Sequence, residues 1–154
     1  MQVIKRNGEK EDVSFDKIKK RIEYLCHGLD LRYVEPIEIC KKVIQGLYDG
    51  VSTTVLDDLS SETAATMATK HPDYAILAAR ISVSNLHKNS DRSFSNTMKA
   101  LYEYIDPKTN EKAQLISDET FKIIWNNRKV LDTAIKHEND YQFDYFGFKT
   151  LERS

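Results

Sequence analysis

The chain has 154 residues, of which 23 are basic and 24 acidic, for a formal net charge of −1. It therefore lacks the basic surplus of a general nucleic-acid-binding protein, and any anion that it binds must be met by a local group of cations. Hydrophobic residues make up 40% of the chain, yet no apolar run approaches the roughly 18 residues that a membrane span needs, so we expect neither a nucleic-acid nor a membrane partner.

The first predicted element is a β-hairpin. Residues 2–15 alternate too strictly for a helix, and Asn7-Gly8 between the two runs is a strong hairpin signal whose two residues are both expected to accept positive φ. From Ser14 the apolar spacing becomes helical, and Gly28 marks the end of this first helix. The predicted buried stripe of the helix consists of Ile18, Ile22 and Leu25.

A second helix is predicted from Pro36 to near Gly50, because proline is favoured in a first turn. The β-branched segment 51–54 suits a short extended piece, and Thr54 is then expected to cap a third helix that runs to about Lys70. The predicted buried stripe of the second helix is Ile37, Cys40, Ile44 and Leu47.

A fourth helix opens at Asp73 and is apolar on two sides, which is typical of a central helix. Its last turn is abruptly polar and contains Lys88, so the end of this buried helix is expected to emerge at a surface or a pocket. Further helices are predicted over 94–105 and 118–136. The aromatic segment 141–148 would expose a large apolar patch unless it docks on protein, so we interpret it as the edge of a larger polypeptide.

The residue inventory offers no catalytic constellation. Cys26 and Cys40 are too few for a disulfide framework or a four-cysteine zinc site, and their apolar positions favour buried thiols. The opening residues contain no signal-peptide core, so a reducing, cytoplasmic setting is the expectation. The histidines are scattered, and there is no glycine-rich phosphate loop. We therefore expect no catalytic residue and no metal site, and binding or regulation is favoured over catalysis.

Polar side chains gather around the predicted hairpin. Polyphosphate recognition needs fixed cations and hydroxyl donors, and an adenine needs an apolar slot with one or two acceptors. These ingredients are present, although for each residue taken singly a solvated face is the simpler explanation. The group consists of Lys5, Arg6, the segment 11–17, Thr53, Asp57 and Lys88.

Six stretches of the chain are distinctive, namely 3–8, 11–22, 42–48, 62–65, 69–81 and 144–154. The first five resemble the ATP-cone domain, and the last one resembles the start of the catalytic region in the eukaryotic-type large subunit of class I ribonucleotide reductases. The resemblance implies a mainly α fold, a four-helix bundle capped by a small three-stranded sheet and followed by additional helices. It also implies an ATP-cone regulatory domain over 1–92 and a helical connector with the truncated start of the catalytic region over 93–154.

In that family the cone takes ATP or dATP as an allosteric effector, with Mg²⁺. ATP permits activity, and dATP drives an inactive oligomer of large subunits. The complete enzyme, with a small radical-generating subunit, reduces ribonucleoside diphosphates for DNA synthesis, whereas this fragment is implied to be regulatory. The resemblance assigns nucleotide binding to Lys5, Arg6, Glu11, Asp12, Val13, Ser14, Phe15, Asp16, Lys17, Thr53, Asp57 and Lys88, and it places Asp16 also at the oligomer interface.

Three alternatives stay open from the sequence. A cone-type transcriptional repressor shares the fold but carries a four-cysteine zinc ribbon before the cone, and those cysteines are absent here. A helical protein-interaction module would have a polar hairpin that is only solvated surface. An independent enzyme would require turnover of a nucleotide by the chain alone.

Overall fold

The computed structural model describes residues 1–154, which form two units. The larger unit comprises residues 1–89 together with 139–154, and the smaller unit comprises residues 90–138. The mainly helical fold with one small sheet agrees with the fold expected from the sequence.

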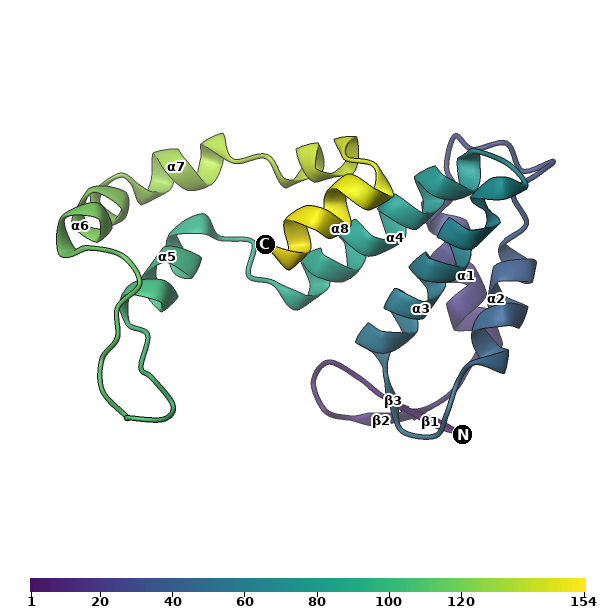
Figure 1. Ribbon diagram of the computed structural model, residues 1–154, viewed down its shortest axis with the longest axis horizontal. Helices are drawn as coiled ribbons and strands as arrows, with labels where there is room; N and C mark the ends of the chain where they lie inside the picture. Colours follow the sequence, from purple (N-terminus) through teal and green to yellow (C-terminus); the bar gives the residue numbers. More distant parts are fainter. The chain divides into compact units, whose positions relative to one another are not determined.

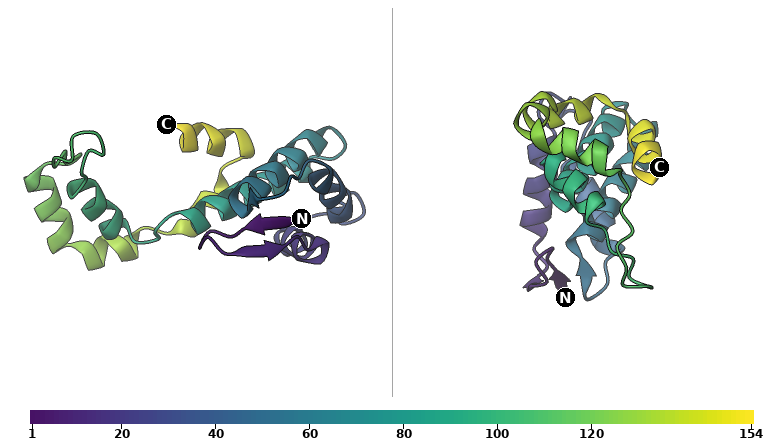
Figure 2. Two further views of the ribbon diagram at one scale, coloured as in Figure 1. Left: turned by 90° about the horizontal axis from the view of Figure 1, so that it is seen from below. Right: turned by 90° about the vertical axis from the view of Figure 1, so that its left-hand side faces the viewer.

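A three-stranded sheet lies at one end of the helices of the larger unit (Figures 1 and 2). The strands are β1 (Gln2–Ile4), β2 (Lys10–Asp12) and β3 (Val51–Ser52), in the spatial order β2-β1-β3. β1 pairs antiparallel with β2 and parallel with β3, so Val3 lies opposite both Glu11 and Val51. The central strand thereby joins the hairpin to the segment that precedes the third helix.

The hairpin loop is longer than the two-residue turn predicted at Asn7-Gly8. The backbone N–H of Gly8 donates to the Lys5 carbonyl at 2.9 Å, and that of Lys5 donates to the Glu9 carbonyl at 2.8 Å. Gly8 has a φ of 86°, whereas Asn7 is not among the residues with positive φ. A turn followed by one left-handed residue closes a three-residue loop, so the expectation of positive φ at both positions was wrong.

Four helices form the bundle above this sheet (Figure 1). They are α1 (Phe15–Leu25), α2 (Pro36–Gln45), α3 (Thr53–Thr66) and α4 (Asp73–Asn89), with the short 3-10 helix η1 (Met67–Thr69) between the last two. The stripe predicted for α1 is buried as expected. In α4, Leu77 and Val83 are buried on different sides, which confirms a central helix, although Ile76 is exposed.

The buried face of α2 differs from the predicted stripe. Ile37 is exposed, whereas Ile39 and Val43 are buried beside Cys40. The helix packs against α1 and α3, and these partners select which positions face the core. Cys26 and Cys40 are both buried free thiols, as the sequence predicted.

The third helix begins before the residue expected to cap it. Ser52 still has an extended backbone and is the N-cap of α3, and its Oγ accepts a hydrogen bond from the Val55 backbone N–H at 3.1 Å. Thr54 was predicted to be the cap, but it already lies in the first turn. Because β3 ends at Ser52, strand and helix follow each other without a linker.

The C-terminal segment completes the larger unit. After the 3-10 helix η2 (His137–Gln142), α8 (Tyr145–Arg153) packs on α4 and buries Phe148. Lys149 Nζ lies 3.5 Å from Asp58 Oδ1 on α3. The aromatic segment thus docks partly within its own chain, while Phe146 stays exposed.

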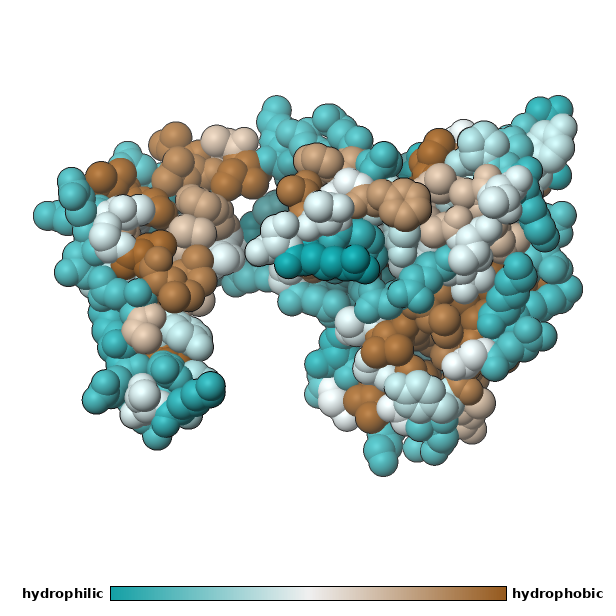
Figure 3. Space-filling model, viewed as in Figure 1, coloured by the Kyte–Doolittle hydropathy of each residue, from teal (hydrophilic) through white to brown (hydrophobic).

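The smaller unit contains α5 (Phe94–Tyr102), α6 (Asp118–Asn126) and α7 (Arg128–Ala134). The single helix predicted over 118–136 is broken at Asn127, whose side-chain Nδ2 donates to the Ile123 carbonyl at 2.8 Å and ends α6. Apolar side chains such as Val130 remain exposed on α6 and α7. Hydrophobic residues, in brown, are visible on the surface of this unit in Figure 3. No helix of the chain combines the length and the apolar character required to cross a bilayer.

Candidate functional site

The functional region lies where the sheet meets the ends of three helices. The hairpin runs into α1, whose first turn is fixed by Ser14: its Oγ accepts a hydrogen bond from the Lys17 backbone N–H at 3.3 Å. β3 runs directly into α3 and so places Thr53 and Asp57 beside the hairpin. The last turns of α4 reach the same region through Asn85 and Asn89, which both bond to Arg6.

A cavity of about 130 Å³ lies between the sheet and the first turns of α1. It has an apolar wall and a polar rim, as a binding site for a partly apolar ligand requires. Pockets that enclose a whole small-molecule ligand hold roughly 300 Å³ or more, so this cavity accommodates only one part of a nucleotide-sized ligand. It is lined by Val3, Glu11, Asp12, Val13, Ser14, Lys17, Ile18, Arg21, Thr53 and Leu56.

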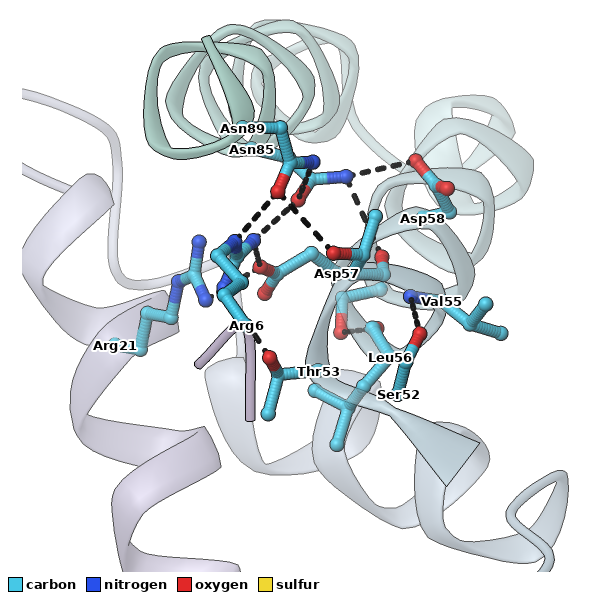
Figure 4. Close-up of polar contacts among 12 residues, drawn as sticks. Arg6, Arg21, Ser52, Thr53, Val55, Leu56, Asp57, Asp58, Asn85 and Asn89 are labelled. Atoms are coloured by element: carbon cyan, nitrogen blue, oxygen red, sulfur yellow. Dashed lines mark hydrogen bonds and ion pairs between the residues drawn. The ribbon is translucent and has the colours of Figure 1, made fainter. Parts of the chain in front are cut away.

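A buried carboxylate, Asp57, stands behind this cavity and is only 1% exposed. Its Oδ2 accepts a hydrogen bond from Arg6 Nη2 at 2.8 Å and pairs with Arg21 Nη1 at 2.5 Å (Figure 4). A carboxylate removed from water is strongly unfavourable unless it is paired. One acidic group therefore holds two guanidinium groups, one from the hairpin and one from α1.

Arg6 connects the hairpin to both α3 and α4 (Figure 4). Its Nε donates to Asn89 Oδ1 at 2.7 Å, its Nη2 also donates to Asn85 Oδ1 at 2.5 Å, and its Nη1 donates to Thr53 Oγ1 at 3.3 Å. The buried Asn85 in turn donates through Nδ2 to Asp58 Oδ1 at 3.0 Å. All three guanidinium nitrogens of Arg6 are thus in use within the chain.

A second, more exposed charge group surrounds Glu11 on β2. Its carboxylate pairs with Lys5, Nζ to Oε2 at 3.4 Å, and also with Lys17. Solvated pairs of this kind contribute about 0–1 kcal/mol, so they are readily exchanged for another partner. Lys5 and Lys17 can therefore turn toward an incoming anion at little cost.

Lys88 shares the electrostatic environment of the two arginines. Removal from water lowers the pKa of the Lys88 ammonium below its ordinary value, and the charge of Arg21 lowers that pKa further. For Arg21 itself, burial is the main cause of a lowered pKa, and the attraction of Asp57 opposes it. Lys88 thus interacts electrostatically with both arginines and with the carboxylate that they share.

The comparisons with known proteins bear directly on this arrangement. A family model described as the ATP cone domain matches residues 1–89. This chain belongs to the ATP-cone family. The matched residues 1–89 contain the sheet, α1 to α4 and every residue of the site described above.

The ATP cone and the residues after it also match longer proteins. The chain is 54% identical over 154 residues to the ribonucleoside-diphosphate reductase large chain of Schizosaccharomyces pombe, covering 100% of this chain and 19% of that protein. It is 55% identical over 152 residues to the large subunit of Caenorhabditis elegans, covering 99% of this chain and 19% of the relative. The Variola virus large subunit is 53% identical over 154 residues, covering 100% and 20%. The chain thus spans about a fifth of the length of the curated relatives that it matches.

Most residues that the resemblance assigned to nucleotide binding lie around this one region of the cone. Lys5 is linked to the cavity by its ion pair with Glu11, and Asp57 behind the cavity pairs with both Arg6 and Arg21. Lys88 interacts electrostatically with these three residues. Phe15 and Asp16 do not line the cavity and are exposed at the start of α1. The assigned residues that line it are Glu11, Asp12, Val13, Ser14, Lys17 and Thr53.

Sequence reasoning missed three polar residues of the cone, namely Arg21, Asn85 and Asn89. Arg21 follows Lys17 at a spacing of four residues, which puts both side chains on one face of α1, and this signal could have identified it. The two asparagines looked like an ordinary polar helix end. Their bonds to Arg6 depend on the docking of the hairpin against α4, which no local pattern encodes.

Proposed function

We propose that this chain is the adenine-nucleotide-binding regulatory part of a ribonucleoside-diphosphate reductase large subunit. The observation that supports it most strongly is the combination, within an ATP-cone domain, of a small cavity with an apolar wall and an adjacent group of cations. Its similarity over almost its whole length to large subunits of that enzyme supports the choice of protein. In this proposal the regulatory domain spans 1–92 and the connector to the catalytic region spans 93–154.

The nucleotide is placed by matching its parts to the site. The adenine enters the cavity against Val3, Ile18 and Leu56, where a planar base removes apolar surface from water. The triphosphate then extends toward the cations Lys5, Lys17 and Lys88. Of the twelve assigned residues, Phe15 and Asp16 contribute through the backbone turn at the start of α1 rather than through the cavity wall.

ATP and dATP differ only at the ribose 2′ position, so discrimination requires a polar group near the sugar. Thr53 on the cavity rim and Asp57 behind it are the groups that we assign to this task. Glu11 and Asp57 already pair with cations, so a Mg²⁺ ion that arrives with the nucleotide is held chiefly by phosphate oxygens and water.

The wider role concerns the complete protein. We assign no catalytic residue to this chain and attribute ribonucleoside diphosphate reduction to the full large subunit with its small radical-generating partner. ATP is proposed to permit that activity, and dATP to inhibit it by driving large subunits into an oligomer. Asp16, exposed on the first turn of α1, is the residue that we place in the oligomer contact. A ligand can shift such an assembly only through its different affinities for the two states.

Isothermal titration calorimetry of the chain with ATP and with dATP tests the proposal. We expect saturable binding of both nucleotides, and Lys88→Ala should weaken both about tenfold, the effect of losing one charge-assisted hydrogen bond. Asp57→Asn should reduce the difference between ATP and dATP. Lys20→Ala, an exposed lysine on α1, is the matched control and should bind like the unaltered chain. Absence of saturable heat with either nucleotide would leave the protein-interaction module as the better explanation.

A further inference from the structure

Arg21 carries two hydrogen-bond donors that the folded chain does not use. Its Nη1 pairs with Asp57, whereas its Nε and Nη2 are buried and have no hydrogen-bond partner. An unpaired donor removed from water costs free energy, and more so when it belongs to a charged group. Buried polar groups of this kind are rare in native proteins, and each one calls for a partner.

The two unused donors form one edge of the guanidinium group. Nε–H and one N–H of Nη2 point the same way, in a planar fork that matches two oxygen atoms of a phosphate or carboxylate. The acidic groups around Arg21 do not supply such a partner, because Asp57 takes only Nη1, while Asp58 pairs with Lys149. The open edge is therefore suited to an anion from outside the chain.

The position of Arg21 brings that edge close to the cavity. Arg21 lines the cavity together with Lys17, one helical turn earlier. Its side chain is 24% exposed, but Nε and Nη2 themselves have almost no exposed surface, so a ligand in the cavity reaches them only when the side chains that cover them move aside. Figure 4 shows Arg21 meeting Asp57 next to Arg6.

The charged groups around Arg21 have a net positive charge. Arg6, Arg21 and Lys88 each contribute a positive charge, and Asp57 supplies the one negative charge among them. The guanidinium group of Arg6 already donates hydrogen bonds to side chains of α3 and α4. Arg21 and Lys88 are therefore the cations of this group that can still bind an anion. An anion that carries several negative charges would neutralise this surplus.

We propose that Arg21 binds a phosphate group of the nucleotide through Nε and Nη2 while Nη1 remains paired with Asp57. This inference rests on the proposed function for the identity of the nucleotide, but the interaction itself needs only a polyphosphate. Asp57 then has a positioning role, because it fixes the orientation of the guanidinium group whose free edge meets the ligand.

Arg21→Lys is the decisive substitution, because lysine keeps the positive charge and can still pair with Asp57 but lacks the two-donor edge. Binding of ATP and of inorganic tripolyphosphate to the whole chain is measured by calorimetry. We expect Arg21→Lys to weaken both ligands by the same factor, about tenfold. Arg32→Lys is the matched control, because Arg32 is exposed and already uses Nε and Nη2 to bind Asp30.

The other outcomes separate the failure of this inference from the failure of the proposed function. Unchanged affinity for both ligands would show that Arg21 does not contact phosphate, and a loss confined to ATP would show that it acts on the base or ribose. If the unaltered chain binds tripolyphosphate but not ATP, and Arg21→Lys weakens the former, the inference survives while the proposed function fails. If the chain binds neither ligand, both are wrong.

A measurement on the unaltered chain covers the case in which Arg21→Lys fails to fold. The Nε–H resonance of Arg21 is followed by ¹H–¹⁵N NMR as tripolyphosphate is added. We expect a saturable shift of this signal, with the Nε–H signal of Arg32 unmoved. A stationary Arg21 signal at saturating tripolyphosphate would contradict the proposed contact.

Discussion

Asp57→Asn is expected to destabilise the nucleotide-free chain strongly. The carboxylate of Asp57 is 1% exposed. Its Oδ2 forms ion pairs with Arg6 Nη2 at 2.8 Å and with Arg21 Nη1 at 2.5 Å. Asparagine keeps the shape of the side chain but removes the charge, so two guanidinium groups lose their shared counter-ion. The arginines would then repel each other with only a neutral acceptor between them.

The size of the effect follows from burial. Removing one partner of a fully buried ion pair costs about 3–5 kcal/mol. The side chains of Arg6 and Arg21 are 26% and 24% exposed, so water can solvate them in part once the charge is lost. We therefore expect the free energy of unfolding to fall by about 2–3 kcal/mol, a large share of the roughly 5–15 kcal/mol that stabilises a typical domain. For a unit of this size that corresponds to a Tm lower by about 10 °C.

Thermal unfolding followed by circular dichroism in phosphate-free buffer measures this difference. Glu62→Gln, an exposed residue on the same helix, provides the matched control and should change the free energy of unfolding by no more than about 0.5 kcal/mol. A Tm for Asp57→Asn within about 2 °C of the unaltered chain would refute the reasoning, because the carboxylate could not then be the buried partner of both arginines.

Three further changes have defined outcomes. Asn85→Ala removes the acceptor 2.5 Å from Arg6 Nη2 and should lower the free energy of unfolding in a urea titration by about 2 kcal/mol; a loss below about 0.5 kcal/mol would contradict this. Burial raises the pKa of the Cys26 and Cys40 thiols from 9.0 to about 11, so both should resist a thiol reagent at pH 8 until the chain is denatured. Since the unfolded thiols ionise first, stability should also fall as the pH rises from about 9 through 11, and rapid labelling of the native chain would argue against buried thiols. Phe148→Ala removes the buried side chain of α8 and should cost about 3–5 kcal/mol, whereas an unchanged Tm would mean that α8 does not stabilise the larger unit.

The elements of the fold that depend on local chemistry could be predicted from the sequence. Alternation and Asn7-Gly8 indicated the hairpin, and apolar spacing gave the stripe of α1 and the central position of α4. The buried face of α2 and the break at Asn127 could not be obtained in this way. They depend on which neighbours a helix packs against and on a side-chain bond that competes with the backbone.

The residues of the site likewise divide into those that the sequence could identify and those that depend on contacts between distant elements. Residues 11–17 are consecutive in the chain, so the resemblance to the ATP-cone domain assigned all of them to nucleotide binding at once. Six of the twelve assigned residues line one cavity. Arg21 was missed because its importance comes from Asp57, a residue on another helix. Pairing between elements far apart in the sequence becomes visible only when the hairpin, α1 and α3 are assembled.

The central claim is that the hairpin end of the ATP cone binds an adenine triphosphate. Its most direct test is the ¹H–¹⁵N spectrum of the labelled chain during titration with ATP. We predict saturable shifts in the backbone amides of residues 11–17, 53–57 and 88–89, which border the cavity and its cations. Shifts that fail to saturate, or that are confined to residues 90–138, would contradict the account.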